Sequence, residues 1–188
     1  MPVIEVHLLE GYAAEARGRL ARALTGAVRL VVPAPAEAIT VITHEMDAAS
    51  YMRGGVARTG APALPDPVAT IRAFLTSMEE RDLEAARSHL GEGFVMRFPG
   101  APAMTALEDL VAWAAPRYRF VKKTYGGFDV ALGDAADDAS VVYCRGALSG
   151  EWPNGDAFSG VRFIDRFELR GGLITAQDVW NDVAEVRS

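Results

Sequence analysis

Two aspartates near the C-terminus of the 188-residue chain interrupt rows of apolar residues. Over residues 161–170 the odd positions are Val, Phe, Asp165, Phe and Leu, and over residues 174–182 the even positions are Ile, Ala, Asp178, Trp180 and Asp. Alternate residues of a strand share one face, so each carboxylate is expected on an otherwise apolar face. A carboxyl group withdrawn from water can act as a general acid or base near neutral pH, which makes both aspartates candidate catalytic groups of a pocket.

The neighbouring predicted strand adds a candidate donor to the same pocket. The Tyr143 hydroxyl, with Arg145 as a second donor, could stabilise a developing oxyanion. Trp180 is assigned to the pocket wall, as are other aromatic residues of this half. The alternative is that the aspartates form structural ion pairs with Arg145, Arg162 or Arg166, or that the predicted faces are reversed.

The composition excludes several partners and cofactors. Nineteen Lys and Arg against 25 Asp and Glu give a net charge of −6 without a basic segment, so nucleic acid is not an expected partner. Cys144 is the only cysteine, and the three histidines, His7, His44 and His89, lie far apart without the spacing of a metal site. No glycine-rich phosphate loop lies between a strand and a helix. We therefore expect no metal and no cofactor, and we assign His7 a structural role.

The chain also lacks membrane and export signals. No apolar run approaches the roughly 18 residues that could cross a bilayer, and no basic region precedes an apolar run at the N-terminus. We expect a cytoplasmic protein that does not bind membranes.

A Pro-, Gly- and Ala-rich stretch at residues 56–67 predicts a linker between two domains. The predicted organisation is a domain at 1–58, a linker at 59–66 and a second domain at 67–188. In the first domain, β-rich runs at 3–9 and 39–43 flank a helical pattern at 13–32. This order predicts a βαβ unit with parallel strands and a right-handed crossover.

The second domain is predicted to begin with helices and to end with strands. Asp66 is the expected N-cap of the first helix, a second helix runs from Asp82 to Gly91, and Thr105 with Glu108 forms a capping box for a third. From residue 128 onward the pattern has period two, and Lys122 and Lys123 are interpreted as a solvated pair. The predicted fold class is α+β, with three helices on a curved antiparallel sheet.

The N-terminal segment carries a family pattern. It reads P-V-I-E-V-H-L-L-E-G over residues 2–11, then a helix, Pro35, I-T-V-I-T-H-E-M and a terminal R-G-G. Over residues 2–55 this resembles the 4-oxalocrotonate tautomerase family, which implies that Met1 is removed and that the free amine of Pro2 acts as general acid or base. An α-amino group titrates at about 7.7 to 8.0, close to where a proton-transfer group must work. If Met1 persists, the Pro2 nitrogen is an amide without basicity.

The match departs from the family at its substrate-binding arginines. Those two positions align with Tyr12 and Thr40, so a clamp for a dicarboxylate is not expected. Arg53 is the candidate replacement cation, and Tyr51 takes the place of the family's aromatic wall. The alternative is that Pro2 only begins a strand and that Arg53 is a solvated turn residue.

The closing pattern F-x-D-x-F-x-L-R-G-G-L-I, followed by D-V-W-N-D, and the order of elements characterise residues 67–186. They resemble the SnoaL-like branch of the nuclear-transport-factor-2-like superfamily. The resemblance implies a cone that encloses an apolar pocket. Members include isomerases, dehydratases and cyclases, and others only bind ligands or dimerise, so the fold alone does not give the activity.

The combined prediction is a tautomerase-type isomerase that acts on a small enolisable carbonyl or carboxylate compound, with a second domain that binds the substrate or also acts on it. A homo-oligomer is expected, because a single βαβ unit cannot bury both faces of its sheet. Two alternatives stay open. One is a non-catalytic ligand-binding and dimerisation protein, and the other is an enzyme whose only active site lies in the cone.

Overall fold

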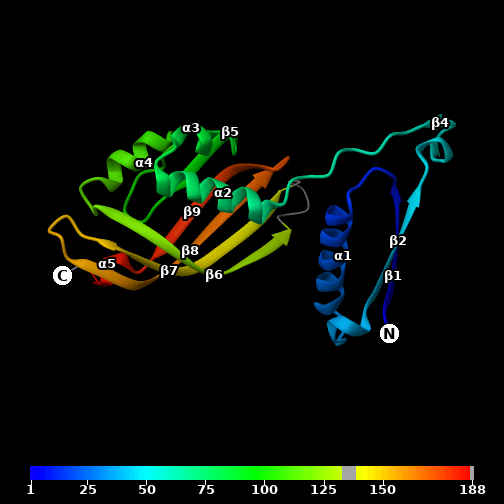
Figure 1. Ribbon diagram of the computed structural model, residues 1–188, viewed down its shortest axis with the longest axis horizontal. Helices are drawn as coiled ribbons and strands as arrows, with labels where there is room; N and C mark the ends of the chain where they lie inside the picture. The colour runs from blue at the N-terminus through cyan, green and yellow to red at the C-terminus, as the bar shows by residue number, and fades with distance from the viewer. Residues whose placement is uncertain (133–138, 187–188) are drawn as a thin grey trace. The chain divides into compact units, whose positions relative to one another are not determined.

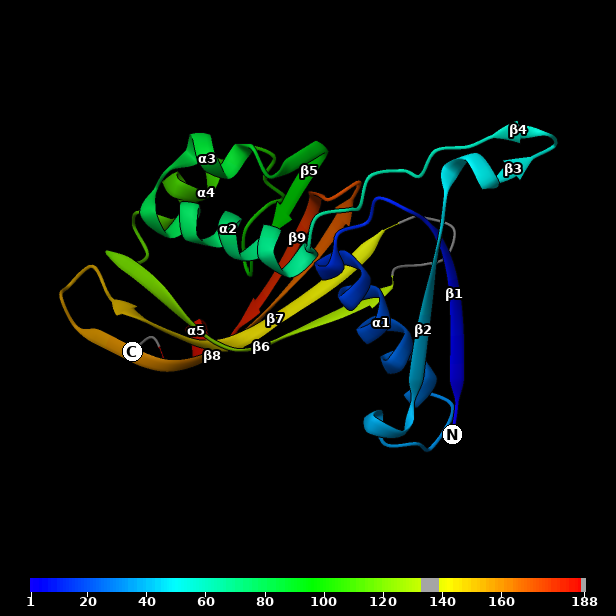
Figure 2. The same cartoon turned by 45° about the vertical axis from the view of Figure 1, so that its right-hand side comes forward.

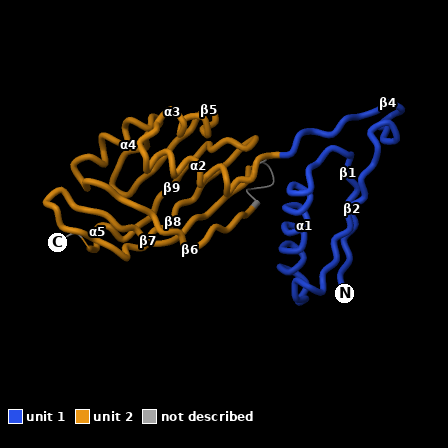
Figure 3. The backbone as a smooth tube through the Cα atoms, viewed as in Figure 1, with its two compact units in different colours: residues 1–63 blue, residues 64–188 orange. Residues whose placement is uncertain are grey.

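The computed structural model describes residues 1–132 and 139–186. The chain divides into two compact units, Met1–Ala63 and Leu64–Ser188, which are coloured separately in Figure 3. Within the described residues, none of the helices has the length and apolar character needed to cross a membrane.

The first unit is the predicted βαβ unit (Figure 1). Strands β1 (Val3–Leu9) and β2 (Thr40–Met46) pair in parallel over their whole length, and helix α1 (Ala14–Arg29) connects them. Side chains alternate along both strands, so one face of the pair packs toward α1 and the other is exposed. The helix ends before the predicted residue 32, because prolines at 33 and 35 cannot continue it.

A short hairpin follows β2. The 3₁₀ turn η1 (Ala36–Ala38) precedes β2, and η2 (Ala48–Ser50) leads into strands β3 (Met52–Arg53) and β4 (Val56–Ala57). Between β3 and β4, Gly54 and Gly55 have φ of 61° and 78°, a conformation that glycine adopts without steric cost. The hairpin therefore holds Arg53 at a fixed turn beyond the C-terminal end of β2.

The second unit contains a five-stranded sheet in the order β5-β9-β8-β7-β6. Its strands are β5 (Leu90–Arg97), β6 (Phe120–Leu132), β7 (Ser140–Glu151), β8 (Ala157–Arg170) and β9 (Leu173–Asn181). Neighbours from β6 to β9 are antiparallel, as predicted, whereas β5 pairs with β9 in parallel, so the sheet is mixed. The register shifts within each pair mark irregularities of the kind that bend strands, and the sheet is visibly curved in Figure 2.

Three helices precede most of the sheet: α2 (Pro67–Glu80), α3 (Leu83–Arg87) and α4 (Leu107–Ala114); a short helix, α5 (Val183–Val186), follows β9. Asp66 caps α2 as predicted, and its Oδ1 accepts a hydrogen bond of 2.9 Å from the backbone N–H of Val68. Helix α3 ends well before the predicted Gly91, because β5 already begins at Leu90.

The predicted capping box of α4 is wrong. Ala106 is the N-cap of that helix and has no side-chain hydrogen bond to offer. The Glu108 carboxylate instead forms an ion pair with Arg87 at the end of α3. The Glu108 carboxylate therefore links α4 to α3 and does not cap the N-terminus of α4.

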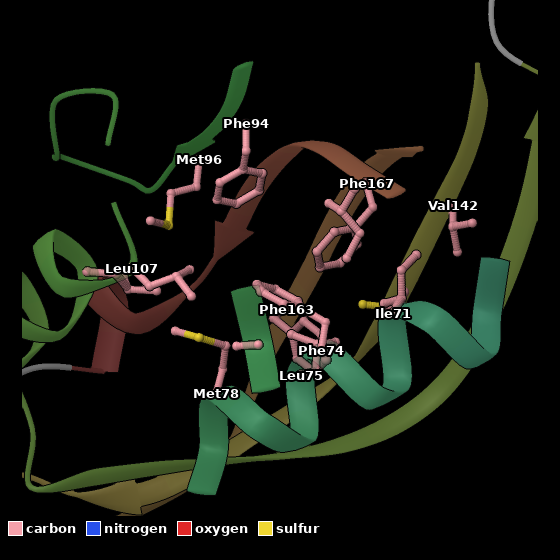
Figure 4. Close-up of a cluster of buried hydrophobic side chains, with 14 of the residues drawn as sticks. Ile71, Phe74, Leu75, Met78, Phe94, Met96, Leu107, Val142, Phe163 and Phe167 are labelled. Atoms are coloured by element: carbon pink, nitrogen blue, oxygen red, sulfur yellow. The ribbon is translucent and has the colours of Figure 1, made fainter. Parts of the chain in front are cut away.

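The helices pack on one face of the sheet and enclose the core (Figure 4). Four apolar residues on one face of α2 are buried: Ile71, Phe74, Leu75 and Met78. The Phe74 ring packs edge-on against Phe94 of β5 and Phe167 of β8, with centroids 6.3 and 6.2 Å away. One aromatic ring thus joins α2 to two strands of the sheet.

We predict that Phe74→Ala lowers the free energy of unfolding of the second unit by about 3 to 5 kcal/mol, because it leaves a cavity between helix and sheet. Phe120→Ala is the matched control, since that ring is 44% exposed and its removal leaves no enclosed void. Urea unfolding followed by tryptophan fluorescence measures both. Equal losses in the two variants would contradict this account of the core.

Candidate active sites

Pro2 lies at the N-terminal ends of both strands of the first unit. Its carbonyl oxygen accepts a 3.0 Å hydrogen bond from the backbone N–H of Thr40, the first residue of β2. Pro2 is half-buried, and Met1 ahead of it is 92% exposed. The bond that joins Met1 to Pro2 is therefore open to a processing enzyme.

A hollow of about 500 Å³ lies at the opposite end of the strands. Its lining includes three residues that the sequence proposed for the substrate site, Tyr12, Tyr51 and Arg53, together with Arg58. A guanidinium nitrogen of Arg53 lies 3.5 Å from the Tyr51 hydroxyl oxygen. Two arginines beside two tyrosines can hold a carboxylate with an apolar or aromatic body.

The structure thus divides the predicted tautomerase site. Tyr12, Tyr51 and Arg53 lie together, whereas Pro2 and Thr40 lie at the other end of the strand pair. In Figure 1 the N-terminus and the β4 hairpin lie at opposite ends of β1 and β2. Both strands run in the same direction for seven residues, which separates the two ends by about 20 Å at roughly 3.3 Å per residue. Within one copy of the chain, Pro2 and Arg53 cannot touch the same small substrate.

The second unit contains a pocket of about 380 Å³ between the helices and the sheet, which is partly open. Its wall is mainly apolar and aromatic, with a few polar groups: Phe98, Pro99, Trp113, Arg117, Tyr118, Val121, Lys123, Leu148, Trp152, Phe163, Asp165, Val179, Asn181, Val183 and Ala184. Asp165 is fully buried in this wall, as its place between Phe163 and Phe167 predicted. Such a cavity suits a small apolar molecule with few polar groups.

The Asp165 carboxylate has partners on one oxygen only. Its Oδ2 forms an ion pair with the Lys123 ammonium and lies 3.4 Å from the Gln177 amide nitrogen. Its Oδ1 is buried and has no hydrogen-bond partner among the described residues, and the same holds for the Trp113 indole nitrogen. Two residues of the cavity wall therefore each carry a buried polar atom without a protein partner in the described part of the chain.

Burial also sets the protonation of two neighbouring groups. Burial raises the pKa of the Tyr118 phenol, against the opposing effect of Arg81 and Arg117, so this cavity residue keeps its proton. Burial and the nearby Asp165 carboxylate raise the pKa of the Cys144 thiol to about 12. The thiol is therefore neutral at physiological pH and is not an activated nucleophile.

Three candidates proposed for this cavity lie on the other face of the sheet. In the strand register Asp165 is opposite Val179, whereas Arg166 is opposite Asp178. The Asp178 carboxylate lies 3.0 Å from Arg97 and 3.3 Å from Arg166, which is the structural ion pair that the alternative interpretation predicted.

Tyr143 is opposite Arg166 in the register and so shares this outer face. Trp180 lies there as well and is 51% exposed.

An irregularity in β9 explains why counting alternate residues misplaced Asp178. Ile174 is paired with Leu169 and faces the core, but the next pair is Ala176 with Glu168. One extra residue, Thr175, lies between these pairs and reverses the alternation. Even positions beyond it therefore point away from the cavity.

Sequence reasoning missed Lys123 and Arg58. Strand β6 begins at Phe120, not at residue 128, so Lys123 shares a face with Val121 and Tyr125 and is not part of a solvated pair. The alternation of side chains with period two that begins at residue 120 was the signal in the sequence that could have placed Lys123. Arg58 is the last residue of the predicted first domain and lies in the Pro-, Gly- and Ala-rich stretch at 56–67, and nothing in that composition indicated a binding role.

Comparison with known proteins identifies both units. The family model described as tautomerase enzyme matches residues 2–59, and the SnoaL-like domain model matches residues 71–177. A probable tautomerase from Ralstonia nicotianae is 38% identical over 65 residues, which cover 35% of this chain and 93% of that protein.

Solved structures share the fold of the second unit. A nuclear-transport-factor-2-like protein of unknown function from Burkholderia pseudomallei has a TM-score of 0.54 at 14% identity, over 65% of this chain and 95% of that chain. TerC, co-crystallised with polyporic acid, has a TM-score of 0.51 at 13% identity, over 63% of this chain and 93% of that chain. The predicted fusion is confirmed: the chain belongs to the tautomerase family through its first unit and to the SnoaL-like family through its second.

Proposed function

We propose that this protein is an isomerase that moves a proton on a small enolisable carbonyl or carboxylate compound, with the amine of Pro2 as general acid and base. Membership of the tautomerase family supports an isomerase-type function. The observation that carries the Pro2 mechanism is the fully accessible Met1 ahead of a half-buried Pro2. Removal of Met1 converts the amide into a secondary amine, which can take a proton from one carbon and return it to another atom of the enol system.

The complete site requires a second copy of the chain. Pro2 and Arg53 lie at opposite ends of the strand pair, so two copies with antiparallel strands would place the Pro2 end of one beside the Arg53 hollow of the other. The exposed sheet face also carries Val3 and Ile42, which are 53% and 39% exposed and would gain from being covered. Arg53 and Arg58 then supply positive charge for a substrate carboxylate, and Tyr51 supplies an aromatic contact.

A second candidate function belongs to the cavity of the second unit. The unpartnered Asp165 oxygen and Trp113 nitrogen support a ligand with both a hydroxyl and a carbonyl group. With Lys123 beside it, the Asp165 carboxylate would serve as the base that accepts the ligand's proton. The co-crystallisation of TerC with polyporic acid supports a small organic ligand for this fold. A cavity that only binds its ligand is the remaining alternative.

We predict that Pro2→Ala lowers the ketonisation rate of an aryl pyruvate enol by at least about a hundredfold, the usual contribution of a general acid or base. Intact mass of the purified protein must first establish that Met1 is absent from both proteins. Pro33→Ala is the matched control, since Pro33 is exposed and lies after α1. Unchanged turnover in Pro2→Ala, or a retained Met1 in an active protein, would exclude the amine mechanism.

Arg53→Ala is expected to raise KM for an aryl pyruvate more than it lowers kcat, because a cation that holds substrate and transition state equally contributes uniform binding. Arg29→Ala, at the end of α1, is the control. An equal loss on a neutral ketone would show that Arg53 supports only the hairpin. Co-expressed Pro2→Ala and Arg53→Ala chains should exceed the mean activity of the two separate variants, because mixed oligomers contain some intact sites.

Asp165→Asn is expected to lower the free energy of unfolding by about 3 kcal/mol, because it leaves the largely buried Lys123 ammonium without its counterion. Adding Lys123→Met should recover most of that loss. Asp182→Asn is the matched control, since its partner Arg162 is 85% exposed and the pair should contribute at most about 1 kcal/mol. Turnover that persists in the Lys123→Met, Asp165→Asn double variant would restrict the cavity to binding.

A further inference from the structure

Two histidines that are distant in the sequence meet on the exposed face of the first unit. His7 of β1 and His44 of β2 are directly opposite in the parallel strand pair. Their imidazole rings stack with centroids 4.7 Å apart and planes inclined by 15°. Strand pairing thus brings together two histidines that lie far apart in the sequence.

A carboxylate completes the cluster. Glu5 precedes His7 by two residues and so lies on the same face of β1. Its Oε2 lies 3.8 Å from the Nε2 atom of His44. One ligand atom from each of the three side chains lies within 4.8 Å of the other two. The three side chains thus lie side by side on the exposed face of the strand pair.

The chemistry of the three donors suits a divalent transition-metal ion. Two imidazole nitrogens and one carboxylate oxygen are a known zinc ligand set, with a fourth position left for water or another ligand. The side chains of His44 and Glu5 are 46% and 60% exposed, so an ion can reach them and the side chains can rotate to close around it. Ligands of one tetrahedral zinc ion are about 3.3 Å apart at a bond length of about 2.0 Å, so the required movement is small.

We propose that Glu5, His7 and His44 form a binding site for one divalent transition-metal ion, with zinc as the representative. None of the three side chains takes part in the Pro2 chemistry. They share the exposed sheet face with Val3 and Ile42, so in the proposed pairing of two chains the ion would lie in the interface between the copies. His7 also borders the hollow that contains Arg53. A bound ion would therefore add positive charge next to the predicted carboxylate site.

The first test is calorimetric titration of the untagged, full-length protein with zinc chloride alone. We expect one ion per chain, and we expect His7→Ala, His44→Ala and Glu5→Gln each to weaken binding by at least about tenfold, the lower end of the effect of disturbing a zinc site. His89→Ala and Glu10→Gln are the controls for loss of a histidine and of a carboxylate, and both should bind as the wild type does. No binding by the wild type, or equal binding by the His7 and His44 variants, would overturn the proposal.

A second measurement needs no variant and so is unaffected by misfolding. The chain has 3 histidines, so their imidazole signals can be separated by NMR in the wild-type protein. Zinc should shift the signals of His7 and His44 and leave that of His89 in place. A shift of His89 alone, or no shift at all, would exclude the site.

Discussion

Backbone hydrogen bonding between paired strands is the constraint on which every candidate site in this protein depends. The register of β1 with β2 sets His7 against His44 and places Thr40 beside Pro2. In the second unit, the register of β8 with β9 puts Asp165 on the cavity face and Asp178 on the outer face. Since a shift of one residue reverses the face of each side chain in a strand, the register decides which groups can cooperate chemically.

In the second unit, the ion pair between Asp165 and Lys123 lies in the wall of the cavity. A buried carboxylate is costly unless a partner compensates its charge, and Lys123 provides that compensation through Oδ2 of Asp165. The second oxygen is left without a protein partner in the described part of the chain. The same residue therefore anchors the sheet through one oxygen and keeps an unpartnered oxygen, in a wall otherwise made largely of aromatic and aliphatic side chains.

The first unit has the opposite character. Its strand pair has only one covered face, and its two groups of candidate residues lie at opposite ends. Under the proposed function, the Pro2 end of one copy and the Arg53 hollow of another form one site, and the same pairing covers the exposed apolar side chains. In that proposal assembly and chemistry are coupled in the tautomerase unit, whereas the cavity of the SnoaL-like unit is lined by residues of one chain.

The sequence by itself determined the two families, the parallel βαβ unit, the buried face of α2 and the burial of Asp165, because local periodicity, caps and turn residues report on their own segment. Only the tertiary structure decided the partners of those residues. The extra residue Thr175 reversed the face of Asp178, the early start of β6 brought Lys123 to Asp165, and strand pairing joined His7 to His44. These outcomes depend on register between segments far apart in the chain, and a pattern read along one segment contains no information about the alignment of another.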